Sequence, residues 1–215
     1  PECALTWTVL VYMAADNNLE KQGIKDLEEL LDVSPSECLR LVVQVDRILA
    51  FYEMGLGSLN PWMTTKRILI DGGVISELAD LGETNAGDPA SLEDFVRWGR
   101  EEFPADRTAL ILWDHGNAWQ GYGVDDSSDK DRLSLAEVFQ ALADGTAGAG
   151  PEPFAFVGFD ACLMADYANL LGMQAFTRYL LVSEEFVPGH GWDYRVFGKL
   201  AADPTMSETA FGQEV

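Results

Sequence analysis

The chain is poor in positive charge. Its 215 residues contain 14 Lys and Arg against 36 Asp and Glu, which gives a net charge of −22. Nucleic-acid binding requires a basic face, so this balance argues against it. The acidity is best read as a solvated surface suited to salty or extracellular surroundings. It would also attract basic substrates over a distance, an effect that salt weakens.

Histidine and cysteine are scarce. The only histidines are His115 and His190, and the only cysteines are Cys3, Cys38 and Cys162. They form no cluster with the ligand spacing of a zinc site, so no bound zinc is expected. No apolar run approaches the ~20 residues that span a bilayer. Because the hydrophobic content of 47% is ordinary, the composition predicts a globular domain with a sizeable core and does not identify its activity.

Two short apolar runs end in residues that carry chemistry. Thr108–Trp113 is followed by His115, and Phe154–Phe159 is followed by Cys162. Such runs are typical of buried strands in a parallel sheet, where ligands gather at the carboxyl ends. If the two strands are neighbours, the imidazole and the thiol emerge at one edge, as a Cys-His nucleophilic pair requires. Taken singly, a buried cysteine is usually inert packing, and a histidine at a strand end is often only hydrogen-bonded.

Strand and helix signals alternate along the chain, which predicts one α/β domain. Further strands are predicted at Thr6–Met13, Leu39–Asp46 and Tyr179–Ser183, and helices at Leu19–Asp32, from Ser91 onward, at Ser134–Asp144 and at Leu163–Gly172. Asp16–Asn18 and Ser91 are expected to cap the helices that follow them. The runs Ile48–Met54 and Thr64–Ile70, separated by Gly55–Pro61, are typical of a β-hairpin.

Four separated blocks of sequence resemble the clostripain family of cysteine peptidases. They are Trp7–Leu19, Leu112–Gly116 with Gly121–Asp125, Gly158–Met164, and Ser183–Glu185 with Pro188–Tyr194. The blocks run in family order across nearly the whole chain. The resemblance implies a caspase-like three-layer α-β-α sandwich with a mostly parallel central sheet, formed by residues 1–215 as a single catalytic domain. Family members generally continue past Val215, so a missing C-terminal portion is expected, and the start at Pro1 predicts a removed upstream segment.

The same resemblance assigns roles to the residues at the strand ends. His115 would be the general base and Cys162 the nucleophile of an endopeptidase that cleaves after Arg, or Lys. The backbone N–H groups of Gly116 and Cys162 would form the oxyanion hole. A glycine beside the base allows a backbone amide to approach a developing oxyanion closely. The implied substrates are proteins or peptides with basic residues.

Asp160 matches the family acid that lines the pocket for a basic side chain. A carboxylate there would bind a guanidinium through two hydrogen bonds, which would favour Arg over Lys. Alternatively, Asp160 caps the helix that follows. Asp193 is a second candidate for the pocket, and Glu184 is either a pocket acid or a surface loop residue. His190 either lines the cleft or belongs to a mobile glycine-rich loop.

The polar segment from Gly121 to Arg132 is expected to be an exposed loop, where cleavage is favoured. The resemblance suggests activation by internal cleavage after a basic residue here, with Lys130 as the first candidate and Arg132 as the second. The alternative is an unprocessed surface loop. The clustered aspartates of this segment are also compatible with Ca²⁺, although they lack EF-hand spacing. No cofactor is otherwise required by the predicted chemistry.

Cys3 and Cys38 each precede a predicted strand. If those strands are parallel neighbours, as the caspase-like order has them, both thiols lie at one edge and can approach the distance that a disulfide requires. A Cys3–Cys38 bridge would leave Cys162 free and would imply an oxidising compartment. This agrees with the secreted or cell-envelope location of the resembled family. A different class of function stays open: a catalytically silent or partner-switched binding domain that keeps the fold and the dyad.

Overall fold

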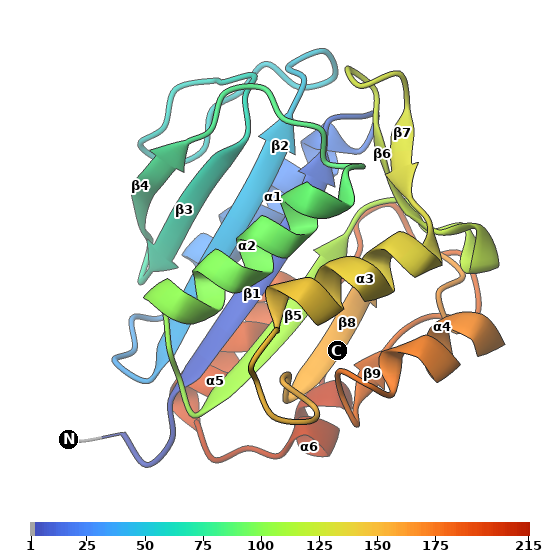
Figure 1. The fold of residues 1–215 in the computed structure, drawn as a ribbon. Helices are drawn as coiled ribbons and strands as arrows, with labels where there is room; N and C mark the ends of the chain where they lie inside the picture. Colours follow the sequence, from blue (N-terminus) through green and yellow to red (C-terminus); the bar gives the residue numbers. More distant parts are fainter. Residues whose placement is uncertain (1–2) are drawn as a thin grey trace.

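A seven-stranded sheet runs through the middle of the computed structural model, which describes residues 3–215 (Figure 1). The strand order is β4-β3-β2-β1-β5-β8-β9, and β3, which pairs antiparallel with both β2 and β4, is the strand that runs opposite to the others. The strands are β1 (Trp7–Ala15), β2 (Leu39–Arg47), β3 (Lys66–Asp71), β4 (Val74–Asp80), β5 (Arg107–Trp113), β8 (Phe156–Asp160) and β9 (Leu180–Leu181). A separate hairpin pairs β6 (Tyr122–Asp125) with β7 (Asp131–Leu133).

Helices cover both faces of the sheet, so the expected three-layer, caspase-like architecture is confirmed (Figure 1). One face carries α1 (Glu20–Leu31), η2 (Tyr194–Phe197), α5 (Gly198–Ala202) and α6 (Glu208–Gly212). The other carries α2 (Pro89–Glu102), α3 (Leu135–Gly145) and α4 (Tyr167–Met173), and the short η1 (Ala118–Gln120) lies in the loop after β5. Within residues 3–215, no helix combines the length and the apolar character that crossing a membrane would need.

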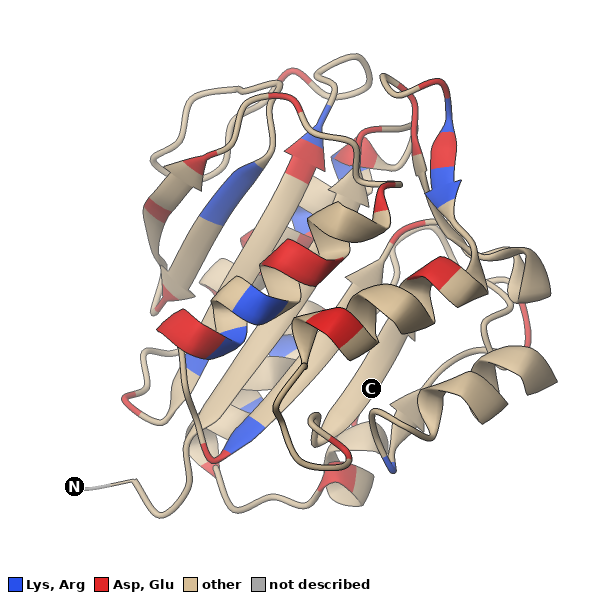
Figure 2. Cartoon of the chain, viewed as in Figure 1, with Lys and Arg blue, Asp and Glu red and all other residues tan. Residues whose placement is uncertain are grey.

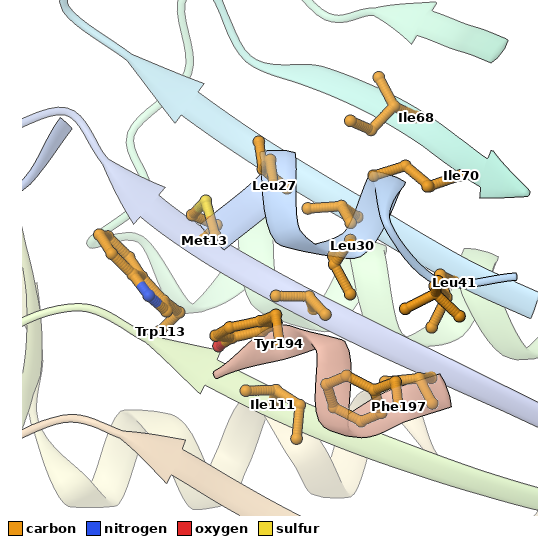
Figure 3. Close-up of a cluster of buried hydrophobic side chains, with 14 of the residues drawn as sticks. Met13, Leu27, Leu30, Leu41, Ile68, Ile70, Ile111, Trp113, Tyr194 and Phe197 are labelled. Atoms are coloured by element: carbon orange, nitrogen blue, oxygen red, sulfur yellow. The ribbon is translucent and has the colours of Figure 1, made fainter. Parts of the chain in front are cut away.

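The central strands are buried on both faces, which explains their near-continuous apolar sequences. Every residue of β1 is buried, and alternate side chains enter two separate apolar clusters. Figure 3 shows the cluster under α1, where Leu27 and Leu30 meet side chains of the sheet and Tyr194 and Phe197 of η2. Trp113 at the end of β5 belongs to this core.

The predicted β-hairpin is misplaced. The observed hairpin is β3–β4, which turns at Gly72 and Gly73 with φ of +54° and +80°. The segment Ile48–Met54 is irregular instead of a strand. The reason is the buried carboxylate of Glu20, which accepts hydrogen bonds from the backbone N–H groups of this segment, at Leu49, Phe51 and Tyr52. Those donors are therefore unavailable to a strand ladder.

Two helices begin elsewhere than predicted. The helix expected from Ser91 starts at Pro89 and is capped by Asp88, whose carboxylate accepts from the Ala90 N–H. The helix expected at Leu163–Gly172 starts only at Tyr167. Asp88 is the cap in place of Ser91 because Pro89 at the first helical position fixes the backbone just after Asp88. By contrast, Ser134 caps α3 in a capping box with Glu137.

Cys3 and Cys38 form a disulfide with a Cα–Cα distance of 5.6 Å. It joins the segments that precede β1 and β2, which are parallel neighbours. Cys162 is the free cysteine, and it lies at the carboxyl end of β8, at the opposite edge of the sheet. The bridge therefore leaves Cys162 as an unpaired thiol at the carboxyl edge of the sheet.

Candidate active site

The pairing of β5 with β8 brings His115 and Cys162 to one edge of the sheet. The two strands are parallel neighbours, and Trp113 is opposite Asp160 in the register. The backbone N–H of Asp114 continues the ladder by donating to the Asp160 carbonyl, at 3.3 Å. His115 and Cys162 each lie two residues beyond that last pair. Both side chains line the same cavity, of about 140 Å³.

Gly116 lies against the backbone of Cys162. A Cβ atom on Gly116 would be 2.0 Å from the Cys162 carbonyl oxygen and 2.9 Å from its nitrogen. No side chain fits in this space, so glycine is required for the close approach of the two loops. The two amides named for the oxyanion hole therefore belong to segments in direct contact.

The His115 ring is held by Asn18. Its Nε2 lies 2.9 Å from Asn18 Oδ1. Because an amide oxygen only accepts, Nε2 carries the proton and Nδ1 is left as the basic nitrogen. Burial lowers the pKa of His115 below its usual value, and nearby Asp126 opposes this in part. The imidazole is consequently neutral at pH 7 and able to accept a proton.

Asn17 and Asp114 tie the histidine loop to the end of β1. Asn17 Nδ2 donates to Asp114 Oδ1 at 2.9 Å and to the Val124 carbonyl at 2.8 Å, and the Val124 N–H donates to Asp114 Oδ2. The expectation that Asp16–Asn18 cap α1 is therefore wrong, since α1 has no side-chain cap. Their position in the sequence could have indicated a role at the site, because polar residues directly after a central parallel strand lie at the carboxyl edge of the sheet, where ligands bind.

Replacing Asn18 by alanine is expected to lower kcat about 10-fold and to leave KM and the melting temperature nearly unchanged. Asn18 is exposed, so its loss removes little packing. The ring would lose the acceptor that fixes its tautomer, as when the orienting partner of a general base is removed. Steady-state kinetics on an arginyl amide measure this. Asn18→Asp retains an acceptor and is expected to recover most of kcat; an equal loss in both variants would contradict the positioning role.

The segment Val187–Gly191 lies beside Cys162 and lines the same cavity. Cys162 Sγ is 3.4 Å from the Val187 nitrogen and 3.9 Å from its carbonyl oxygen. Val187, Pro188, Gly189 and Gly191 all line the cavity with Cys162. A substrate that reaches the sulfur must therefore contact or displace this segment.

Asp160 is buried at the end of β8 and lines the same cavity. Its Oδ2 accepts from the Trp192 N–H at 3.1 Å. Burial raises the pKa of this carboxyl to about 6, and the Trp192 hydrogen bond opposes the shift. Tyr194 is also close, but its buried hydroxyl does not meet hydrogen-bond geometry. The alternative role as a helix cap is wrong, because Asp166 caps α4.

Gly191 lets the loop close over Asp160. Its φ is +61°, and a Cβ atom there would be 2.5 Å from Asp160 Oδ2. Both the left-handed backbone and the lack of space require glycine. The close contact of this loop with Asp160 therefore depends on the glycine at position 191.

The other predicted pocket residues do not line the cavity that Cys162 lines. Asp193 and His190 line a larger neighbouring cavity, of about 810 Å³, which shares Val187, Pro188 and Gly191 with the first. Asp193 is exposed and bound by Arg195, with Nε–Oδ1 at 2.7 Å, so its charge is already paired. His190 is exposed and bonds the Gly191 carbonyl. Glu184 is exposed and lines neither cavity.

Asp26 is an acid of this region that the sequence did not reveal. It lines the larger cavity from α1 and accepts from Trp113 Nε1 at 2.7 Å. Burial raises its pKa to about 8, and the charge of Asp160 adds to the rise. A largely protonated Asp26 supplies little charge at pH 7, which leaves Asp160 as the charged acid beside the thiol.

Lys130 and Arg132 lie in the β6–β7 hairpin, so the segment from Gly121 to Arg132 is more ordered than the predicted loop. Lys130 is exposed in the connecting turn with φ of +61°, and Arg132 is exposed within β7. Of the aspartates in this segment, Asp125 is buried in a second acidic cluster, which lies at the end of β1.

A caspase-like sheet with a thiol and an imidazole at one edge defines a class of cysteine-dependent hydrolases. Within this class the sequence comparison is specific: the clostripain family, peptidase family C11, matches residues 11–214. The chain belongs to the clostripain family. It is therefore a cysteine peptidase by family.

Three relatives show how much of such a protein the chain represents. Clostripain from Hathewaya histolytica is 27% identical over 91% of this chain and 42% of its own length. A secreted C11 cysteine protease from Bacteroides thetaiotaomicron, solved with an irreversible peptide inhibitor, is 25% identical with a TM-score of 0.77, over 97% of this chain and 57% of that one. A zymogen C11 protease from Parabacteroides distasonis shares the fold at 19% identity, with a TM-score of 0.69, over 94% and 55%. The chain thus spans about half the length of these relatives.

Proposed function

We propose that this chain carries the catalytic centre of an endopeptidase that cleaves after arginine and, less well, after lysine. The observation that carries the proposal is the single cavity lined by Cys162, His115 and Asp160. A thiol, a neutral imidazole and a buried carboxyl group line this cavity together, which supports roles for them as nucleophile, base and pocket acid. The substrates would be proteins or peptides with exposed basic residues.

In the proposed reaction, His115 Nδ1 accepts the thiol proton and Cys162 Sγ attacks the scissile carbonyl carbon. The carbonyl oxygen becomes an oxyanion, which the N–H groups of Gly116 and Cys162 stabilise. The C–N bond breaks as His115 returns the proton to the leaving amine. Water, deprotonated by the same imidazole, then hydrolyses the thioester and releases the acid product and the thiol. Asn18 keeps the ring in the tautomer that both steps need.

The preference for arginine rests on Asp160. A planar guanidinium can make two parallel hydrogen bonds to a carboxylate, whereas an ammonium acts as a point charge. Burial makes the carboxylate a strong partner, because an uncompensated charge in this place is unfavourable and the substrate cation relieves it.

Covalent labelling tests the proposed function. An arginyl chloromethylketone is expected to modify Cys162 selectively at neutral pH, as found by peptide mapping, while the same reagent with a neutral side chain reacts much more slowly. Modification only after denaturation would instead favour the alternative, a silent binding domain that keeps the dyad. Cys162 is half-buried and free, so its accessibility alone does not prevent reaction.

We further infer that internal cleavage after Lys130 activates the protein. The support is the exposed turn that carries Lys130 and its position shortly after the base. Intact-mass analysis of the purified protein is expected to show two fragments that meet after Lys130, and Lys130→Ala is expected to stay uncut. Cleavage at Arg132 in place of Lys130 would move the site to the second candidate. Cleavage at neither residue would contradict the inference.

We also infer that the protein has an extracytoplasmic location. A disulfide between Cys3 and Cys38 persists in oxidising compartments and is rare in reducing ones. Non-reducing peptide mapping of the protein isolated from its native compartment, showing this bridge intact, would support the location; fully reduced cysteines there would contradict it.

A further inference from the structure

Backbone hydrogen bonds join the segment that follows β9 to the segment that follows the nucleophile. The Ala165 N–H donates to the Ser183 carbonyl at 3.0 Å, and the Leu163 N–H donates to the Glu185 carbonyl at 3.2 Å. The two pairs advance by two residues in opposite directions, as in an antiparallel ladder. The segment after β9 is therefore held at a fixed position relative to Cys162.

Val187 is two residues further along this segment, and its backbone meets the sulfur. The Val187 N–H donates to Cys162 Sγ at 3.4 Å. Leu163, directly after the nucleophile, has a left-handed backbone with φ of +62°, which is uncommon for a residue with a side chain. Strain of this kind persists where surrounding contacts hold it, often at functional sites. Here the Glu185 carbonyl holds the Leu163 N–H while the adjacent cysteine faces the Val187 N–H.

The other surroundings of Cys162 offer little stabilisation for a thiolate. Thiolates form readily at the N-terminus of a helix or beside a basic side chain. The helix that follows Cys162, α4, begins only at Tyr167, and no residue of this helix is charged (Figure 2). Among the described residues that line the cavity with Cys162, none is Lys or Arg, whereas Asp160 is an acid. Its carboxylate opposes a negative charge on the sulfur.

His115 supplies only part of the stabilisation that a thiolate needs. Burial lowers the pKa of His115, so the imidazolium that would pair with the thiolate is less favourable than it would be in water. A backbone N–H that is fixed at the sulfur has no such dependence, because its dipole is the same in every protonation state of the imidazole.

We propose that the backbone N–H of Val187 is a catalytic donor that stabilises the Cys162 thiolate. Its bond to the neutral thiol is weak, because sulfur is a poor acceptor. A hydrogen bond to a charged acceptor is stronger, so the contact favours the thiolate over the thiol. The thiol proton still goes to His115 Nδ1, and no further reactant takes part. The proposal rests on the proposed function, in which Cys162 is the nucleophile, and adds a group outside the dyad.

Alkylation of Cys162 by iodoacetamide tests the proposal without turnover. Val187→Pro removes the N–H, and Pro188 already restricts residue 187 to the extended region that proline accepts. The measured quantity is the ratio of the alkylation rate near pH 6, which depends on the thiolate fraction, to the rate near pH 9.5, where free cysteine is ionised. In Val187→Pro this ratio is expected to be about 5- to 10-fold lower than in the wild type. The matched control Val187→Ala keeps the N–H and is expected to keep the wild-type ratio.

The same decrease is expected when Val187→Pro is combined with His115→Ala, because the donor acts on the sulfur directly. An unchanged ratio in Val187→Pro, an equal decrease in Val187→Ala, or the loss of the effect in the His115→Ala background would overturn the proposal. None of these measurements requires a cleaved peptide. The proposal and the endopeptidase function can therefore fail separately.

A second measurement does not depend on the folding of the proline variant. In NMR spectra of the isotope-labelled protein, the Val187 amide proton is expected to move downfield as rising pH ionises Cys162, because its acceptor becomes charged. This movement is expected to be absent in Cys162→Ala. An amide proton that does not move in the wild type, or that moves equally in Cys162→Ala, would overturn the proposal.

Discussion

Replacing Cys162 by alanine is expected to lower kcat on an arginyl amide by at least about 10⁴-fold while the protein stays folded. The thiol is the one group in the cavity that can form the acyl intermediate, and the histidine alone can only assist attack by water. The fold should tolerate the change because Cys162 is half-buried and its sulfur makes only weak contacts with the Val187 backbone. Single-turnover kinetics measure the loss of activity, and the melting temperature shows whether the protein stays folded.

His190→Ala is the matched control for the dyad. His190 is the second histidine and lies in the loop that covers the site, but its side chain is exposed and lines only the larger cavity. We expect kcat within about threefold of the wild type, as for surface substitutions. Retained turnover in Cys162→Ala would contradict the assignment of Cys162 as the nucleophile. Loss of turnover in His190→Ala would contradict the assignment of His115 as the base.

The catalytic edge was predictable because it depends on strand order. Two short apolar runs that end near His115 and Cys162 place both residues at the carboxyl edge of any parallel sheet in which the strands are neighbours. The family blocks supply that order, and the observed register of Trp113 with Asp160 agrees with it. The disulfide follows from the same geometry at the opposite edge.

Features that depend on long-range side-chain contacts were not predictable. Asp16, Asn17 and Asn18 look like helix caps in sequence, yet their partners lie about 100 residues away, in the histidine loop and the hairpin. Glu20 similarly takes the backbone donors of a segment that reads as a strand. In both cases a tertiary hydrogen bond to a buried polar group overrides the local preference.

Replacing Asp160 by asparagine is expected to lower kcat/KM for an arginyl substrate by about 10²–10³-fold, the effect of removing one partner of a buried charge pair. Asparagine is nearly isosteric and can still accept from the Trp192 N–H, so the fold is expected to persist. A substrate with a neutral side chain before the cleaved bond should lose little. An equal loss on both substrates would mean that Asp160 supports the nucleophile loop and does not select the substrate.

The pH profile separates these roles further. Because burial raises the pKa of Asp160 to about 6, the free enzyme holds the charged form above that pH and loses it below. For the wild type, kcat/KM on arginyl substrates is expected to fall about 10-fold per pH unit below pH 6. In Asp160→Asn the fall should be reduced to the part that protonation of the base His115 causes. In Asp193→Asn it should stay as in the wild type, because the exposed carboxylate of Asp193 is already paired with Arg195. An unchanged fall in Asp160→Asn would mean that Asp160 does not contribute to it, and a reduced fall in Asp193→Asn would identify Asp193 as the acid of the pocket.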